Sequence, residues 1–380
     1  MNPIVYFDNA ATSFPKPECV SYEMYKCMHE YCGNPGRGSN SMAMAASEAV
    51  YNARSALKTF FNAQKEENVI FTYNATYAIN IAVKCFVKRR SHVLISDLEH
   101  NAVYRPIVSE TVCGNLRFDI FNTFDADPDA IIKDLIRKTR KDTAAIVCTA
   151  ASNICNMRLP LERIGQYARE RGLLFILDAS QLAGHTAIDM KKCNISILCA
   201  PFHKGLYAAQ GGGFLIVAED VMPRRTLIEG GSGVNSKEVR MPSTLPEMLE
   251  AGTLSTQNAA GLVKAIEFLS GTGIEDIERY EDALSSSMRN ILRSYSDLTV
   301  HGDVCDGTVF SVTSKKYSTD ELASLLNDRG IMVRGGLHCA PLAHKKLGTV
   351  NTGTVRFSLG IFNTERELEY LDGVLCDILK

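Results

Sequence analysis

Residues that could take part in catalysis or ligand binding follow several of the short apolar runs in this chain. They are Asn74-Ala75-Thr76, His100, Asn153, Asp178, Gln181 and the pair His203-Lys204. If the runs are neighbouring strands of an open α/β sheet, these residues meet beyond the carboxyl ends of the strands, where such sheets bind ligands. Any one of them could be a surface residue or a satisfied core group, but the whole set predicts a binding site at one sheet edge.

A cysteine in a glycine-rich segment is the second chemical feature. Cys339 lies in Arg334-Gly335-Gly336-Leu337-His338-Cys339-Ala340-Pro341. Two glycines before the cysteine and a proline after it predict a loop that can approach a bound ligand. Arg334 and His338 would favour the reactive thiolate. A buried structural cysteine is the alternative, although loops are poor places to bury a thiol.

The other cysteines carry no pattern of this kind. The chain has 12 cysteines, scattered and without a C-x-x-C pair. In a chain of 380 residues whose start lacks a signal peptide, they predict reduced thiols in the core and a cytoplasmic location. We predict no metal site from them.

The elements that must position the polar residues are seven short apolar runs separated by helical patterns. The runs are 69–73, 92–96, 116–121, 144–150, 173–180, 196–200 and 212–218. Several are apolar throughout, which favours strands covered on both faces of a mostly parallel sheet. Helical patterns over 78–90, 130–140 and 161–172 alternate with them, so the sequence predicts an α/β fold.

The chain changes character after this region. Residues 219–253 are rich in Gly, Pro and charge and predict a long loop. Helices are predicted over 257–271, 274–295, 319–330 and 364–379, with short strands between the later ones, one of them over 331–334. We expect a large domain over 18–255 and a smaller α+β domain over 256–380, which the N-terminal arm 1–17 joins.

The bulk composition excludes some classes of function. Hydrophobic residues make up 46% and charged residues 22% of the chain, and the formal net charge is −2. No strong field therefore favours nucleic acid or an anionic membrane. No apolar run reaches the roughly 18 residues of a membrane-spanning helix, so we expect no membrane partner.

Several motifs resemble one known family in their order along nearly the whole chain. They are YFDNAATS (6–13), FILDASQLAGH (175–185), HKG (203–205), EAGT (250–253), RGGLHCAPL (334–342) and VRFSLGIFNTEREL (355–368). This set resembles the class V aminotransferase-fold enzymes, and most closely the cysteine desulfurases and selenocysteine lyases with a short cysteine-bearing loop. The resemblance implies fold type I (aspartate-aminotransferase-like), pyridoxal phosphate as cofactor and a homodimer with a shared active site.

The resemblance implies roles for the residues at the sheet edge. Lys204 would hold pyridoxal phosphate covalently and then carry protons, while Asp178 would keep the pyridine nitrogen protonated. A charge pair near 4 Å is worth about 4 kcal/mol at an effective dielectric of about 20, enough for that task. Gln181 and Asn153 match hydrogen-bonders of the ring hydroxyl, and His100 matches the ring-stacking histidine of the catalytic group. The alternatives are a solvated lysine, a capping aspartate and an unrelated strand-end histidine.

The expected phosphate site departs from the family pattern. Thr76 and Ala75 lie at a helix start, where backbone N–H groups favour an anion, His203 can donate, and Thr253 resembles a residue that reaches the phosphate from the neighbouring subunit. The family usually has a Gly-Thr-Thr-like sequence at the helix start, where this chain has Asn74-Ala75-Thr76. It usually has Ser or Thr followed by Gly before the His-Lys pair, where this chain has Pro201-Phe202. We therefore expect fewer side-chain contacts to the phosphate.

The remaining matches concern the substrate. Arg356 matches the arginine that grips the substrate carboxylate, with a surface arginine as the alternative. Asn34 and Arg37 resemble a family active-site loop, Ala11 in the N-terminal arm resembles a backbone contact, and Arg334 lies beside the cysteine loop.

The expected reaction converts L-cysteine to L-alanine and leaves the sulfur as a persulfide on Cys339, for transfer to an acceptor protein. Selenocysteine lyase, another pyridoxal-phosphate-dependent C–S lyase and an aminotransferase are alternatives. A non-catalytic scaffold, suggested by Pro201-Phe202, is a further one.

Overall fold

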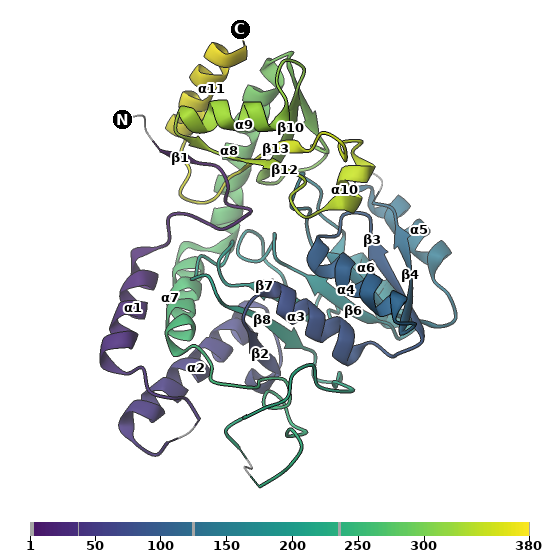
Figure 1. Ribbon diagram of the computed structural model, residues 1–380, viewed down its shortest axis with the longest axis vertical. Helices are drawn as coiled ribbons and strands as arrows, with labels where there is room; N and C mark the ends of the chain where they lie inside the picture. Colours follow the sequence, from purple (N-terminus) through teal and green to yellow (C-terminus); the bar gives the residue numbers. More distant parts are fainter. Residues whose placement is uncertain (1–3, 37, 124–125, 235–236, 380) are drawn as a thin grey trace.

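A seven-stranded sheet forms the centre of the larger part of the molecule (Figure 1). The computed structural model describes residues 4–36, 38–123, 126–234 and 237–379. The strands are β2 (Val69–Thr72), β3 (Ser91–Ser96), β4 (Leu116–Phe121), β5 (Thr143–Thr149), β6 (Leu174–Asp178), β7 (Ile197–Pro201) and β8 (Gly213–Val217). Their order is β2-β8-β7-β6-β5-β3-β4, and only β8 runs antiparallel to its neighbours. Each predicted apolar run supplies one strand, and the mostly parallel sheet is confirmed.

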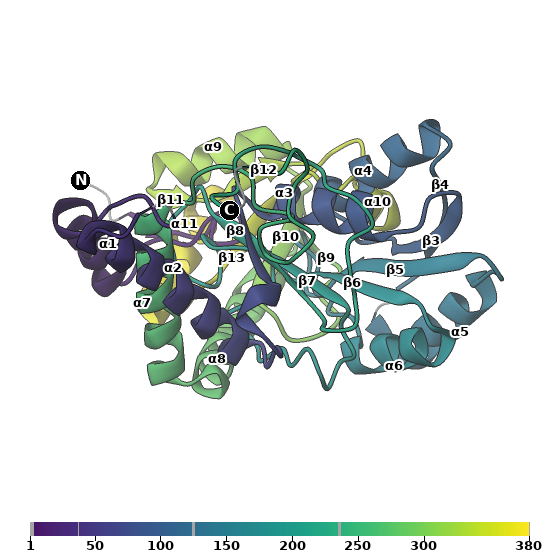
Figure 2. The same cartoon turned by 90° about the horizontal axis from the view of Figure 1, so that it is seen from below.

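Helices cover both faces of this sheet (Figure 2). On one side lie α3 (Ala75–Ile81), its π-helical continuation η2 (Ala82–Phe86) and α4 (Asn101–Val112), and on the other α5 (Pro128–Lys138) and α6 (Leu161–Arg171). Successive strand residues point to opposite faces, so Val93 and Leu94 belong to different core clusters. Burial on both faces explains why the runs are apolar throughout.

Three further helices close one end of the sheet. They are α1 (Glu18–Glu30), α2 (Ser41–Phe60) and α7 (Thr256–Thr272), and the short helix η1 (Glu66–Asn68) leads from α2 into β2. Gly261 of α7 packs so closely on α1 that a Cβ there would lie 2.7 Å from Met24 Cγ. Leu262 of α7 shares a core cluster with the sheet. The domain boundary at residue 256 stays a prediction.

The C-terminal part has its own antiparallel sheet and core. Its strands are ordered β12 (Arg334–Gly336), β13 (Thr354–Ser358), β10 (Val309–Ser314) and β9 (Leu298–His301). Its helices are α8 (Ile274–Ser294), α9 (Thr319–Asp328), α10 (Pro341–Lys346) and α11 (Glu365–Leu379). Ser318 and Glu321 form a capping box that starts α9.

The N-terminal arm belongs structurally to this C-terminal part. Strand β1 (Val5–Tyr6) pairs in parallel with β11 (Ile331–Met332), and Phe7 packs in the same core as Phe357. The predicted strand 331–334 therefore divides, because Ile331 pairs with the arm and Arg334 with β13. Beyond its first strand the arm crosses to the large sheet.

The remaining long segment agrees with its prediction as a loop. Between residues 219 and 253, the described residues contain no helix or strand. No helix within the described parts of the chain combines the length and apolar character needed to cross a membrane.

Candidate active site

Lys204 lies just beyond the end of β7, against the N-terminal arm. Its backbone oxygen accepts a hydrogen bond from Ser13 Oγ (2.9 Å), and the preceding carbonyl, that of His203, accepts from Ser13 N (3.0 Å). Burial, opposed by the charge of Asp178 and reinforced by that of Arg356, lowers the pKa of Lys204 to about 8. Near pH 8 a large fraction of the Lys204 amine is therefore neutral, and only the neutral amine can act as a nucleophile or base.

Asp178 ends the neighbouring strand β6 and is 3% exposed. Its carboxylate accepts hydrogen bonds from the backbone N–H of Ser180 (3.0 Å) and from the Ser180 hydroxyl. Its negative charge opposes the burial that lowers the pKa values of Lys204 and His100, so these three side chains interact. The structure thus brings the expected lysine and aspartate to the same sheet edge.

His100 caps the N-terminus of α4 at this edge. Its Nδ1 accepts a hydrogen bond from Ala102 N (3.0 Å), which places the ring proton on Nε2. Burial, with smaller contributions from Lys204 and Arg356, lowers the pKa of His100 to about 4. The ring is therefore neutral at physiological pH.

Asn153 and Gln181 link this edge to other segments. Asn153 is buried and donates from Nδ2 to the backbone oxygen of His338 (2.7 Å), while its Oδ1 has no partner. Gln181 donates from Nε2 to the backbone oxygen of Ala10 (3.1 Å). Both amides therefore keep an oxygen that these bonds do not use.

Arg356 comes from the C-terminal sheet and is 1% exposed. Its Nη1 donates to the backbone oxygen of Asn153 (3.0 Å) and its Nη2 to Asp8 Oδ1 (2.6 Å), whereas the buried Nε has no partner. The sequence reasoning did not single out Asp8. The signal was available, because Asp8 lies inside the motif YFDNAATS, from which only the alanines were considered.

The loop after β12 carries Cys339 to an exposed position. His338 and Cys339 have φ values of 48° and 56°, in the left-handed region that few non-glycine residues adopt. Their two carbonyl groups accept hydrogen bonds from Asn153 Nδ2 (2.7 Å) and Asn101 N (2.7 Å). The loop is therefore tied both to the Lys204 edge and to the first residue of α4.

One expectation about this loop is wrong. Burial, aided by Arg356, lowers the pKa of His338 to about 3, so its ring is neutral at physiological pH. A neutral imidazole cannot stabilise a thiolate by its charge. Cations near this loop include Arg334, which is exposed, and Arg105, which lines a groove with Cys339.

Cys339 lines a shallow groove of about 570 Å³ with residues of α4. The α4 residues are Asn101, Tyr104, Arg105, Val108 and Ser109, and the loop adds Leu337 and Pro341. The thiol is thus accessible from outside the molecule.

The residues expected to hold the phosphate differ in exposure and in hydrogen bonding. Thr76 is exposed in the first turn of α3, Ala75 is buried beside it, and the N–H of Tyr77 donates to the capping Asn74 Oδ1 (3.0 Å). His203 keeps a buried Nδ1 without a partner, and burial lowers its pKa to about 4.

Phe202 points into the core instead. Its ring lies 5.8 Å from that of Phe71 and 6.1 Å from that of Phe214. It also fills the space beside Gly212, where a Cβ would come within 2.1 Å of the ring. The aromatic residue before His203 therefore serves packing.

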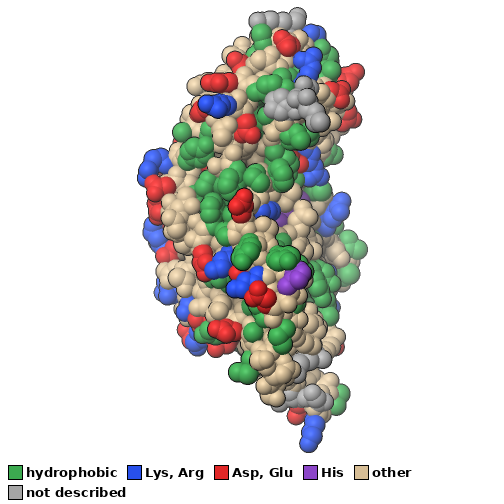
Figure 3. Space-filling view, turned by 90° about the vertical axis from the view of Figure 1, so that its left-hand side faces the viewer, with side chains coloured by type: hydrophobic (Ala, Val, Ile, Leu, Met, Phe, Trp, Pro, Cys, Tyr) green, Lys and Arg blue, Asp and Glu red, His purple; other side chains and the backbone are tan. Residues whose placement is uncertain are grey.

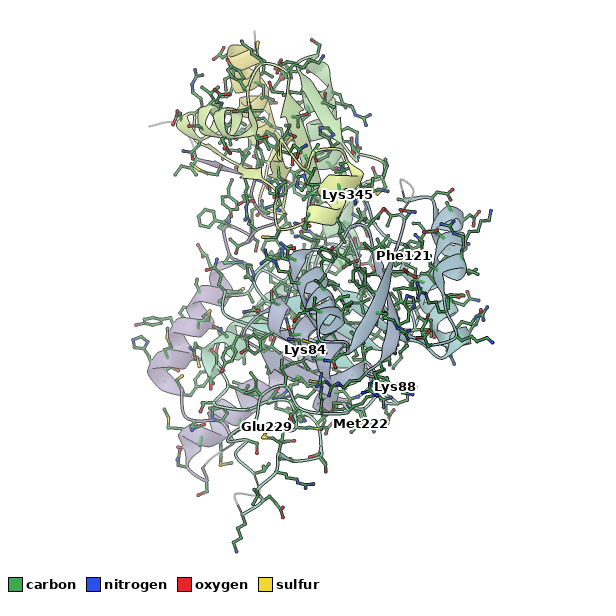
Figure 4. All side chains as sticks on the ribbon, turned by 45° about the vertical axis from the view of Figure 1, so that its right-hand side comes forward. Lys84, Lys88, Phe121, Met222, Glu229 and Lys345 are labelled. Atoms are coloured by element: carbon green, nitrogen blue, oxygen red, sulfur yellow. The ribbon has the colours of Figure 1, made fainter. Side chains whose placement is uncertain are left out.

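Two expected site residues lie together in another cavity. Asn34 and Thr253 line a pocket of about 190 Å³ whose walls include the buried ion pair of Arg54 and Glu250. Thr253 also lines a second pocket, with Tyr77 of α3 and Phe202. The long loop that leads to Thr253 extends away from the C-terminal sheet: Figure 4 shows Glu229 and Met222 at the opposite end of the large unit from Lys345 on α10.

Two expected substrate contacts remain. Ala11, half-buried in the arm, donates its N–H to the oxygen of Asp8 (3.0 Å). Arg37, expected to contact substrate, falls outside the described residues.

The residues around Lys204 fit the ring of pyridoxal phosphate. Three buried polar atoms at this edge lack partners, namely Asn153 Oδ1, His203 Nδ1 and Arg356 Nε, and buried polar atoms without partners are uncommon in proteins. A carboxylate, a neutral histidine and an amine of lowered pKa stand beside them. Within the described parts of the chain, no three His, Cys, Asp or Glu side chains are grouped to hold a metal ion.

Comparison with known proteins agrees with this arrangement. The chain is 29% identical to a probable cysteine desulfurase of Methanothermobacter thermautotrophicus, over 98% of this chain and 94% of that protein. It is 30% identical to a probable cysteine desulfurase of Aeropyrum pernix, over 99% and 94%. The apo structure of a cysteine desulfurase from Thermococcus onnurineus superposes with a TM-score of 0.89 at 27% identity, covering 99% of this chain and 94% of that one.

A match to a family description covers almost the whole chain as well. A second solved structure, a cysteine desulfurase of Escherichia coli at 22% identity and a TM-score of 0.88, covers 98% of this chain and 94% of that one and shows the same fold. Residues 5–371 match the family described as Aminotransferase class-V. The chain therefore belongs to the class V aminotransferase family.

Proposed function

We propose that this protein is a cysteine desulfurase that uses pyridoxal phosphate, the cofactor of its family. L-Cysteine and the Cys339 thiol would give L-alanine and a persulfide on Cys339. The observation that carries the proposal is the convergence on Lys204 of Asp178, His100 and Arg356, whose charges or burial set the pKa values there. The relatives described above bear the same functional name.

Lys204 supplies the amine of the site. With a pKa of about 8 it can hold the cofactor covalently and, once released, remove the proton from the substrate Cα. When bound, the cofactor provides an electron sink for that carbon. Asp178 would hold the ring nitrogen, His100 would lie against the ring, and Asn153 and Gln181 would offer their unused amide oxygens to ring substituents.

Arg356 would bind the substrate carboxylate. It is buried, so its hydrogen bonds act in a medium of low dielectric, and its Nε is still unpaired. The backbone oxygen of Asn153 already accepts a hydrogen bond from Arg356. Ala11 lies in the arm and donates its N–H to Asp8, the ion-pair partner of Arg356.

Cys339 would receive the sulfur. Its thiolate attacks the substrate sulfur, so an S–S bond forms as the C–S bond breaks. The freed Cβ then takes a proton, and Lys204 returns a proton to Cα, which gives alanine. The hydrogen bonds that Asn153 Nδ2 and Asn101 N donate to the two loop carbonyls limit the range over which the thiol can move. The groove along α4 would admit an acceptor protein that removes the persulfide sulfur.

A second copy of the chain would complete the phosphate end. Thr253 lines one pocket with Tyr77 and Phe202 and a second pocket with Asn34, and Thr76 is exposed at the start of α3. Exposed apolar residues gather on the side of the molecule that carries α1 and α2, in the view of Figure 3. They include Tyr22, Tyr25 and Met28 of α1 and Met44 and Tyr51 of α2. A homodimer would cover them and bring Thr253 to the partner's site.

The proposed compartment is the cytoplasm. All 12 cysteines are free thiols in the structure, in keeping with a reducing environment.

The decisive experiment compares purified wild type with Cys339→Ala. Wild type should show the absorption of bound cofactor and release alanine and sulfide from L-cysteine with a reductant. The variant should keep the absorption and lose alanine release. Undiminished desulfuration by the variant would exclude Cys339 from the reaction, and absence of cofactor from wild type would exclude the whole proposal.

A further inference from the structure

Arg356 is held by two protein acceptors before any substrate arrives. Its Nη2 donates to Asp8 Oδ1 at 2.6 Å and its Nη1 to the backbone oxygen of Asn153 at 3.0 Å. The guanidinium retains N–H donors beyond these two, including the buried Nε. A carboxylate can still bind in a bidentate manner to donors that neither acceptor uses.

Asp8 is placed by the same strand that carries Arg356. It forms an isolated β-bridge with Ser358, two residues after Arg356 on β13. The carbonyl oxygen of Phe7 accepts a hydrogen bond from Ser358 N (2.7 Å), and that of Asp8 accepts from Ala11 N (3.0 Å). Asp8 therefore cannot leave the guanidinium by a backbone movement without detaching the arm from the C-terminal sheet.

The electrostatic setting also requires a counter-charge here. A buried guanidinium without a paired anion costs several kcal/mol. The neighbouring cations Lys204 and Arg334 add to the positive charge at this position. Among the described residues, Asp8 is the carboxylate that forms an ion pair with Arg356.

We infer that Asp8 is a positioning residue that orients Arg356 for the substrate carboxylate. It holds Nη2 and leaves Nε without a protein partner, available to the substrate. The inference rests on the proposed function only in taking Arg356 as the carboxylate receptor. The opposite arrangement, in which substrate displaces Asp8, predicts tighter carboxylate binding once the Asp8 carboxylate is removed.

The test measures ligand binding by the cofactor-loaded enzyme. Wild type, Asp8→Asn and Asp8→Ala are titrated with L-alanine, which has a carboxylate, and with cysteamine, which has none, and the change in cofactor absorption is followed. L-Alanine should bind about tenfold more weakly to Asp8→Ala, with a smaller loss for Asp8→Asn, and cysteamine should bind as to wild type. For L-cysteine turnover, KM should rise about tenfold while kcat changes less.

A matched control removes an ion pair elsewhere in the C-terminal part. Asp303→Asn disrupts the pair with Arg289 (2.9 Å) and should leave both titrations unchanged. Equal weakening of both ligands in the Asp8 variants would mean a merely structural role, and unchanged or tighter L-alanine binding would also overturn the inference. Failure of the wild type to release alanine from L-cysteine would instead refute the proposed function, and the L-alanine titration would still decide the role of Asp8.

Discussion

The surroundings of Lys204 and those of Cys339 differ in almost every physical property. Lys204 lies among buried charges that shift the pKa values of one another. Cys339 is exposed, and its loop is held by hydrogen bonds from uncharged donors, Asn153 Nδ2 and Asn101 N, to its carbonyl groups. Proton chemistry and sulfur transfer therefore make opposite demands, since the first needs a low dielectric and the second needs access for an acceptor.

The largest effect on cofactor attachment and activity is expected for Lys204→Ala, in the buried region. The variant should lose covalent cofactor attachment and, by analogy with removal of other catalytic nucleophiles, activity by about 10⁴-fold or more. Cofactor absorption and alanine release measure the two effects. The exposed Lys345→Ala is the control and should behave as wild type, and an active Lys204→Ala enzyme would remove the lysine from the chemistry.

Phe202→Ala tests whether this side chain serves the core or the phosphate site. Because Phe202 packs between Phe71 and Phe214, its truncation should cost about 3–5 kcal/mol of unfolding free energy, measured by urea denaturation. The rate of cofactor dissociation should change by less than about twofold, because a core side chain makes no contact with phosphate. A stable variant that loses cofactor quickly would contradict the core assignment.

The lowered pKa of Lys204 can be tested by pH. Only the neutral amine can attach the cofactor, so the rate of reconstitution of the cofactor-free protein should rise about tenfold per pH unit below pH 8 and level off above it. Absorption after addition of pyridoxal phosphate gives the rate. A rate that keeps rising to about pH 10 would indicate an ordinary lysine.

The smallest effect is expected in the exposed loop that carries Cys339. His338→Gln replaces a neutral ring by a neutral amide, so the rate at which iodoacetamide alkylates Cys339 should change by less than about twofold. Arg334→Gln, which removes a charge, should slow alkylation more. Subtraction of the rate for Cys339→Ala isolates the one thiol, and a large effect of His338→Gln would restore a charged histidine to the loop.

The sequence predicted the sheet and the residues at its edge because their signals are local. Apolar runs covered on both faces and the polar residue after each run depend only on neighbours in the chain. The split of the strand 331–334 between two sheets was not predictable, because Ile331 pairs with the arm more than 300 residues away in sequence. Ile331 pairs with β1, and Arg334 pairs with β13.

The charge state of His338 shows the same limit within the site. Beside a cysteine in sequence, a histidine suggests a helper cation, but burial and the proximity of Arg356 decide its protonation. Likewise, Phe202 in the sequence suggested a phosphate site with fewer side-chain contacts. The sequence did not show that its ring packs against Phe71 and Phe214.

The sequence by itself therefore determined the class of fold, the order of its strands along the chain and the family to which its motifs point. The pairing of Asp8 with Arg356 and the neutral state of His338 depended on the tertiary structure. The reason is physical: propensity and periodicity act over a few residues, whereas burial, ion pairing and pKa depend on which distant segments the fold brings together.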